Sequence, residues 1–154
     1  MAAVKASWKG MARLKEKLRR LPLEVQNDVK PALKDGAQIV ADDVARSMRE
    51  TKTGRVYKRK GRVYQASAAG QAPAVFSGRL IGSIKIEDAT GNRPGVRLRI
   101  TGAQAMALEF GSTRSAARPF LFPAVKRNRP KINTEIKRQV KASLQRMAAR
   151  RGNG

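Results

Sequence analysis

The chain has 154 residues, with 34 Lys and Arg against 11 Asp and Glu, and a formal net charge of +23. It contains no Cys and no His, which excludes disulfides, thiolate nucleophiles, Cys/His zinc sites and imidazole acid–base chemistry. No apolar run approaches the roughly 20 residues that cross a bilayer, and the N-terminal segment lacks the apolar core of a signal peptide, so we expect an intracellular protein without a membrane partner.

The basic charge is concentrated at both ends of the chain and in one internal segment. Residues 1–21 carry a net charge of +6, residues 52–65 carry +6 and residues 126–154 carry +9, whereas the rest is nearly neutral. Such a chain favours polyanions or an acidic protein surface as partners. We expect three parts: a basic N-terminal helical extension over 1–21, an α+β domain over 22–125 with a basic hairpin at 54–64, and a basic C-terminal helix and tail over 126–154.

Two amphipathic helices are expected at the start of the chain. Between residues 23 and 50 apolar side chains recur every three or four positions, which is the spacing of one helical face. Pro22 suits the first turn of this long helix, whereas Pro31 lies inside the pattern and should kink or divide the helix; we favour a kink. A second, shorter helix is predicted upstream by apolar residues at the same spacing, namely Trp8, Met11, Leu14, Leu18 and Leu21.

The segment GRVYKRKGRVY, residues 54–64, repeats the four residues Gly-Arg-Val-Tyr and predicts a hairpin with Lys58 to Gly61 at its tip. Tyr57 and Tyr64 have rings able to stack on bases, but two aromatics in a hairpin more often pack across the strands. The basic side chains are candidate contacts to DNA or to an acidic protein, with the protein partner favoured. They are Arg55, Lys58, Arg59, Lys60 and Arg62.

Alternating apolar and charged residues predict two strands in the middle of the chain. Val96 to Ile100 alternates with Arg, which buries one face and leaves the other cationic, and Ile84 to Glu87 alternates in the same way. Turn-forming residues between them predict an antiparallel hairpin. Residues 103–110 are compatible with a third strand, and AQAMAL on its own is equally compatible with a short helix, so both alternatives stay open. The expected fold is therefore α+β, with a long N-terminal amphipathic helix, a small antiparallel sheet of three to four strands and a basic C-terminal helix.

An apolar stripe marks the C-terminal helix, which is strongly basic elsewhere. The stripe consists of Ile132, Ile136, Val140, Leu144 and Met147. Because it needs something to pack on, we expect the helix to become ordered against a neighbouring subunit, with Ile136, Val140 and Leu144 in the interface.

Residues 108–125 combine a glycine turn with two prolines, which suits a docking segment. Gly111 allows a positive φ directly after Glu109-Phe110, so the chain is expected to turn sharply there. Pro119 and Pro123 stiffen the segment that follows.

The aromatic residues of this segment and its single carboxylate have different expected roles. Phe110 and Phe120 are favoured as core residues under the sheet, and Phe122 is the better interface candidate. Glu109 is expected to pair with an Arg, within the subunit or across an interface. No second carboxylate, His or metal-ligand cluster accompanies it in the sequence, so we expect no catalytic, cofactor or metal site and no enzymatic activity.

Four sequence blocks stand in order over residues 53–125: GQAPAV at 70–75, SGRL at 77–80, LEFGST at 108–113 and RPFLFPAV at 118–125. This order resembles a signature of a siphophage tail-component family, the tail-completion or head-to-tail joining proteins similar to gene product ten of lambdoid phages. The family reads roughly Glu-Phe-Gly-Thr and then Arg-Pro-Phe-Leu-x-Pro-Ala. Many members have Tyr-Ala five residues before the Glu, where this chain has Gln104-Ala105.

The resemblance implies a virion structural protein of the neck, which completes the tail and joins it to the head-side connector. It implies a ring of identical subunits around the DNA channel, with hexameric symmetry. The implied partners are the tail tube or tail terminator protein, the head-side connector or stopper protein, and the genome DNA passing through the channel. The implied location is the virion neck, with the host cytoplasm during assembly. The implied assembly interface includes Glu109, Phe110, Gly111, Arg118, Pro119, Phe120, Phe122 and Pro123.

Two other readings compete with the neck protein. A nonspecific basic nucleic-acid-binding protein would use the hairpin and the C-terminal Lys and Arg residues on phosphates. A ribosomal-type protein would explain the basic ends but leaves the motif blocks unexplained. Sequence-specific DNA reading is not expected, since the chain has no zinc-finger spacing, basic-zipper heptads or aromatic RNA-binding signature.

Overall fold

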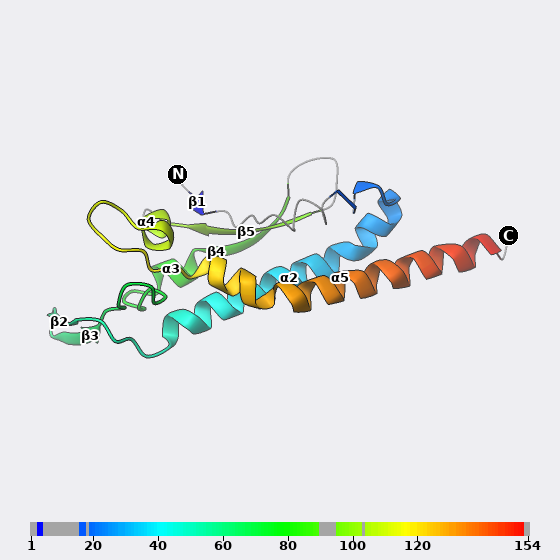
Figure 1. Ribbon diagram of the computed structural model, residues 1–154. Helices are drawn as coiled ribbons and strands as arrows, with labels where there is room; N and C mark the ends of the chain where they lie inside the picture. The colour runs from blue at the N-terminus through cyan, green and yellow to red at the C-terminus, as the bar shows by residue number, and fades with distance from the viewer. Residues whose placement is uncertain (1–2, 5–15, 18, 90–94, 103, 153–154) are drawn as a thin grey trace.

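The computed structural model describes residues 3–4, 16–17, 19–89, 95–102 and 104–152 (Figure 1). Two long helices, α2 (Leu23–Arg49) and α5 (Leu121–Gly152), lie side by side and run in opposite directions. A small antiparallel sheet covers the helix pair on one side, and a separate β-hairpin extends at one end of the molecule. The expected α+β class is confirmed. Within these described ranges, no helix combines the length and the apolar character that a membrane span requires.

Helix α2 confirms the predicted long helix and runs through Pro31 without a break. Pro22 precedes it, and its carbonyl oxygen accepts the backbone N–H of Gln26 at 3.1 Å. Gly36 faces α5, where an added Cβ would lie 3.0 Å from the Ile132 side chain. A side chain at position 36 would therefore push the two helices apart.

The helix predicted over residues 8–21 falls largely outside the described residues. Residues 16, 17 and 19 are helical, and residues 5–15 and 18 are not among those described.

Helix α5 begins at Leu121 rather than at residue 126, so it includes the RPFLFPAV block from its fourth residue onward. Its apolar stripe is not exposed as expected, because it packs on α2 of the same chain. Ile136 is only 2 % exposed, and Val140 is half-buried. Only Leu144 of the three proposed interface residues is largely exposed. The expectation that this stripe requires a neighbouring subunit is therefore corrected.

The sheet contains β1 (Ala3–Val4), β5 (Val96–Thr101) and β4 (Ile84–Asp88), in that spatial order. The β4–β5 hairpin is confirmed, with Ile86 opposite Leu98. The sheet has three strands, at the lower end of the three to four expected, and its outer strand β1 has only two residues.

Of the two alternatives for residues 103–110, the short helix is confirmed and the third strand is wrong, since Ala105–Phe110 forms the helix α4. Its buried residues, Ala105 and Glu109, are four apart, and its exposed residues, Met106 and Phe110, are four apart as well. This four-residue spacing is that of an α-helix, although the apolar residues of the segment would also fit a strand. A second short helix, α3, spans Arg79–Gly82 and leads into β4.

The core lies where α2, β5, α4 and the start of α5 meet. Its most deeply buried members are Val40, Val44, Met48, Ile100, Ala105, Phe120, Leu121, Ala124 and Val125. The first turns of α5 are therefore part of the core rather than a separate docking segment.

Candidate assembly surfaces

The predicted hairpin at 54–64 is confirmed as β2 (Val56–Arg59) and β3 (Arg62–Gln65). Its turn consists of the two residues Lys60 and Gly61, with φ of 50° and 73°. Positive φ at both central positions defines the type I′ turn, whose twist matches that of the paired strands. The second glycine of the repeated sequence is thus explained by the turn.

The base of the hairpin is fixed to the body of the protein. Gly54 approaches the opposite segment so closely that a Cβ there would lie 2.6 Å from the carbonyl oxygen of Ala66. Beside it, the side-chain oxygen of Gln71 accepts hydrogen bonds from the backbone N–H and the hydroxyl of Thr53, each at 3.1 Å, and from the backbone N–H of Ala68 at 3.0 Å. Gln71 belongs to the GQAPAV block, so that block positions the hairpin.

The aromatic residues of the hairpin pack on one another. Tyr57 and Tyr64 lie opposite each other in the register and stack with ring centroids 5.5 Å apart. Phe76 adds a third ring 4.8 Å from Tyr64, and the Arg55 guanidinium carbon lies 5.7 Å from the centroid of Tyr57. The cross-strand packing expected from the sequence is confirmed, and these rings stiffen the hairpin.

The opposite face of the hairpin carries two exposed valines beside Lys58. Val56 and Val63 are 58 % and 67 % exposed. Arg55 and Arg62 alternate onto the tyrosine face, and Lys60 lies in the turn. We call the group Arg55, Val56, Lys58, Lys60, Arg62 and Val63 the hairpin surface. None of its four cations forms an ion pair with a carboxylate of the described part of the chain. The Arg59 side chain lies outside the described residues.

Glu109 caps the N-terminus of α5 instead of pairing with an Arg as expected. Its two carboxylate oxygens accept the backbone N–H groups of Phe120 at 2.9 Å, Leu121 at 3.0 Å and Phe122 at 2.9 Å. The next residue, Pro123, has no N–H. None of the first four residues at this helix end therefore has a backbone N–H without an acceptor. The carboxylate is 4 % exposed and lies at the positive end of the helix dipole.

This cap joins the LEFGST block to the RPFLFPAV block. LEFGST supplies the carboxylate, and RPFLFPAV supplies the three amides. Between them Gly111 has φ of 82°, as predicted, and an added Cβ would lie 3.1 Å from the backbone nitrogen of Ala117. The loop 111–118 is therefore a compact turn between α4 and α5.

Arg118 closes this turn onto the loop behind it. Its side chain donates to the carbonyl oxygen of Ser67 at 3.1 Å, the hydroxyl of Ser115 at 2.9 Å and the carbonyl oxygen of Ala116 at 3.1 Å. The guanidinium thus makes its hydrogen bonds within the chain, where it holds two loops together.

The three phenylalanines of the motif differ in burial. Phe120 is in the core as expected, whereas Phe110 is 57 % exposed and its predicted core position is wrong. Phe122 is half-buried and forms an edge-to-face pair with Phe110, with centroids 5.7 Å apart. Met106, one turn before Phe110 in α4, is also exposed. We call Met106, Phe110 and Phe122 the aromatic patch.

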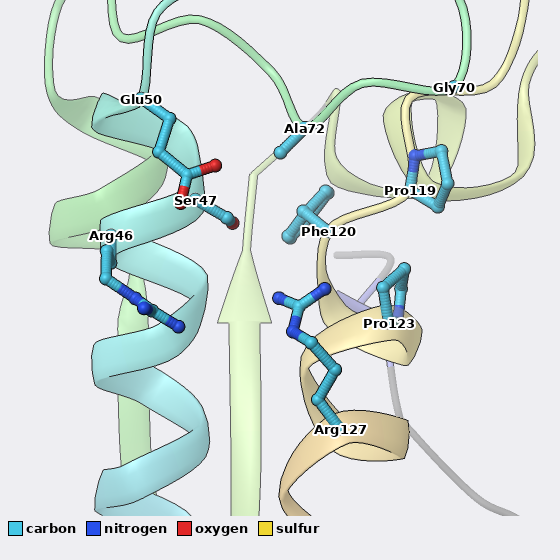
Figure 2. Close-up of a pocket in the computed structure, with 9 residues that line it drawn as sticks. All are labelled: Arg46, Ser47, Glu50, Gly70, Ala72, Pro119, Phe120, Pro123 and Arg127. Carbon is cyan, nitrogen blue, oxygen red and sulfur yellow. The ribbon is translucent and has the colours of Figure 1, made fainter.

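A cavity of about 370 Å³ opens between the C-terminal end of α2 and the start of α5 (Figure 2). Figure 2 shows Arg46 and Arg127 pointing toward one another from the two helices, with Glu50 and Ser47 near them. Both guanidinium groups bind Asp43, and the Ser47 hydroxyl donates to the carbonyl oxygen of Val44. Arg46, Arg127 and the Ser47 hydroxyl therefore already have partners, and this lining offers no nucleophile held beside a base.

Asp43 is the main polar link between α2 and α5, and the sequence analysis did not single it out. It is 6 % exposed and accepts hydrogen bonds from Arg46, from Arg127 at 3.1 Å and from Asn128 at 2.8 Å. Burial alone would raise the pKa of Asp43, but the hydrogen bonds from Arg46 and Arg127 outweigh it and hold the pKa below its ordinary value. Asp43 stands next to Asp42 in the sequence, which gave no sign of which carboxylate would be buried.

Lys52 is a second residue that sequence reasoning missed. It is buried, and its ammonium donates to the carbonyl oxygen of Ser47 at 2.6 Å, near the end of α2. Burial lowers the pKa of Lys52, and the nearby Glu50 opposes that shift. A cation at this position neutralises the negative end of the helix dipole, so its role here is structural.

Comparisons with known proteins return no match for this chain among family models, curated proteins or solved structures.

Proposed function

We propose that this chain is a phage virion structural protein of the neck, which completes the tail and joins it to the head-side connector as a ring around the DNA channel. The observation that carries the proposal is the coupling between the motif blocks. The Glu109 cap ties LEFGST to RPFLFPAV, and Gln71 of GQAPAV fixes the base of the hairpin. Two of the blocks that resemble the tail-component signature are thus joined by direct contacts, and a third holds the hairpin.

A ring subunit needs two different surfaces, because each copy contacts one neighbour with one patch and the next neighbour with another. The described residues include the hairpin surface and the aromatic patch, which carry exposed apolar side chains on separate elements. Exposed aromatic and apolar side chains rimmed by cations are typical of interface cores and their edges. We assign these two surfaces to contacts between protein subunits, in a ring of six copies if the symmetry implied by the resemblance holds.

The partners that the resemblance implies are the tail tube or tail terminator protein on one side and the head-side connector or stopper protein on the other. The chain would occupy the head-proximal end of the tail in the virion, after assembly in the host cytoplasm. The net charge of +23 favours partners with acidic surfaces at these contacts.

The proposal is tested by adding the purified, gold-labelled chain to isolated tail tubes and imaging them by electron microscopy. We expect label at one end of each tube only, in a fixed number of copies per tube measured by mass photometry. Label distributed along the tubes, or no association with them at all, would contradict the proposal. Adding free duplex DNA as a third component separates the alternative function, a free-standing basic nucleic-acid-binding protein, which would coat the DNA uniformly and leave the tubes bare.

A further inference from the structure

The basic residues of α5 fall into two groups with different surroundings. Most of its arginines face a carboxylate of the same chain: Arg127, Arg138, Arg146 and Arg150 pair with Asp43, Glu135, Asp28 and Glu24 at 3.0, 2.6, 3.0 and 3.2 Å. Its lysines are all exposed, and none has an ion pair or hydrogen bond with any described residue. They are Lys126, Lys131, Lys137 and Lys141, which we call the lysine face.

Three lysines of the lysine face lie on the side of α5 that points away from α2. At 100° per residue, Lys126, Lys137 and Lys141 fall within about 60° of one another around the helix, whereas Lys131 lies about 80° to 140° from them. Ile132, which lies against Gly36 of α2, is about 120° to 180° away from the first three. From the first lysine to the last, the face extends about 22 Å along the axis at 1.5 Å per residue.

The chemistry of this face favours a nucleic-acid backbone over a protein surface. Protein interfaces have apolar cores in which Lys is depleted, and only Leu144, at the far end of this face, is an exposed large apolar residue of α5. Duplex DNA carries one charge per about 1.7 Å of its axis, so about 13 phosphates pass along a face of this length. Four lysines without partners suit such a dense and regular array of charge.

The size of the net charge also favours nucleic acid as the partner. Each chain carries a net charge of +23, and the carboxylates of Glu24, Asp28, Asp43 and Asp88 already pair with arginines or with two lysines outside α5. Copies of the chain repel one another through this net charge, and in an assembled ring the charge adds up. A polyanion relieves this repulsion through the release of its counterions.

We propose that the lysine face of α5 binds the phosphate backbone of duplex nucleic acid without reading its sequence. Lysine suits this role because it contacts phosphates as a point charge, without the planar two-bond geometry of arginine. Contacts of this kind allow a protein to slide along DNA. This inference goes beyond the proposed neck function and does not depend on it.

The first test measures the salt dependence of binding to a fluorescent 30-base-pair duplex of mixed sequence by anisotropy. The variant K126Q/K131Q/K137Q/K141Q removes four charges from the lysine face. The control R49Q/R79Q/K85Q/R114Q removes four exposed charges scattered over other elements. At about 0.9 per phosphate contact, we expect the slope of log K against log salt to become shallower by about 3.6 in the first variant and by less than about 1 in the control.

Equal losses in the two variants would overturn the proposal, since binding would then reflect net charge alone. A third variant, R55Q/K58Q/K60Q/R62Q, gives a further decisive outcome. If it loses more slope than the lysine-face variant, nucleic acid binds the hairpin surface and the proposal is wrong. Changing the sequence of the duplex is expected to alter the affinity less than twofold.

A second test uses the unmodified protein and therefore does not depend on the folding of any variant. Lysine acetylation is followed by mass spectrometry with and without the duplex at 0.1 M salt. We expect all four lysines of the face to be protected at least fivefold, with Lys85 of β4 unchanged. Protection of Lys58 and Lys60 in place of the lysine face would contradict the proposal. Because no phage component is present, failure here leaves the neck function untouched, and failure of the tail-tube experiment leaves this result untouched.

Discussion

The hairpin and helix α5 are the two most basic described regions of the molecule, yet they place their charge differently. The hairpin surface carries four cations around two exposed valines, and no acidic residue occurs in the sequence between Glu50 and Glu87. Helix α5 meets three carboxylates of α2, which pair with its arginines and leave its lysines to solvent. The net charge of a segment therefore does not indicate its partner. The apolar residues beside the charge, and the pairing of that charge, do indicate it.

The hairpin and α5 also differ in the contacts that hold them in place. The hairpin depends on local geometry, since Gly54 allows a close approach and Lys60 and Gly61 form the turn. Helix α5 depends on distant groups, with Glu109 at its start and Asp43 beside its second turn. Changes to these distant groups should affect α5 and leave the hairpin intact.

The largest expected effect follows from Glu109→Gln. A glutamine has one acceptor oxygen, and its amide group would face a backbone N–H of α5, so at least one donor is left buried without a partner. We expect a loss of about 3 kcal/mol in the free energy of unfolding, measured by urea denaturation with circular dichroism.

The matched control is Glu135→Gln on the exposed side of α5, where Glu135 pairs with Arg138 at 2.6 Å. Exposed pairs of this kind contribute about 0.5 kcal/mol or less. Similar losses in the two variants would show that Glu109 does not act as the cap of α5.

The next effect in size is expected from Asp43→Asn. This change leaves Arg46 and Arg127 without their buried carboxylate partner and should cost about 2 kcal/mol. The neighbouring Asp42 is exposed and accepts a hydrogen bond only from Gln38 among the described residues, so Asp42→Asn should cost less than about 0.5 kcal/mol. If the two variants lose equal stability, the link between α2 and α5 lies elsewhere.

The same carboxylates predict how stability depends on pH. Hydrogen bonds from Ser143 and Arg146 lower the pKa of Asp28, and those from Lys30 and Lys34 lower the pKa of Asp88. Hydrogen bonds from Arg138 and Gln139 lower the pKa of Glu135 to about 2.

A lowered pKa in the folded state adds stability above the unfolded pKa, which is lost as pH falls through the folded value. Stability should therefore stay constant from about pH 8 to 5 and fall between about pH 4.5 and 2. Asp43→Asn should flatten this fall in acid-titration curves, whereas Asp42→Asn should not. An equally steep fall in the Asp43→Asn variant would count against this account.

Local patterns predicted much of the fold. The periodicity of residues 23–50, the alternation in β4 and β5 and the repeated hairpin sequence each specify their own element without help from the rest of the chain. The positive φ at Gly111 was likewise a local requirement. Residues 103–110 were ambiguous because their apolar residues are mostly small and fit both periods.

What the sequence did not predict depends on contacts between distant segments. The burial of Ile136 on α2, the choice of Asp43 over Asp42 and the cap made by Glu109 across eleven residues all require the tertiary fold. Phe110 and Phe120 have the same side chain, and only the helical spacing of α4 turns Phe110 outward. The lysine face also depends on the tertiary fold, because carboxylates of α2 form ion pairs with arginines of α5 and leave its lysines without such partners.

The smallest expected effect concerns the hairpin surface and tests its assignment to a protein partner. The variant V56S/V63S removes two exposed apolar side chains, so we expect less than about 0.5 kcal/mol of change in stability. If these residues form an interface core, binding to isolated tail tubes should weaken about tenfold, or about 1.4 kcal/mol, as measured by co-sedimentation. Leu23→Ser is the control, because Leu23 is equally exposed on α2 and should leave binding unchanged. The lysine-face variant should also bind tubes normally; if it loses tube binding and V56S/V63S does not, the two basic regions have the opposite roles.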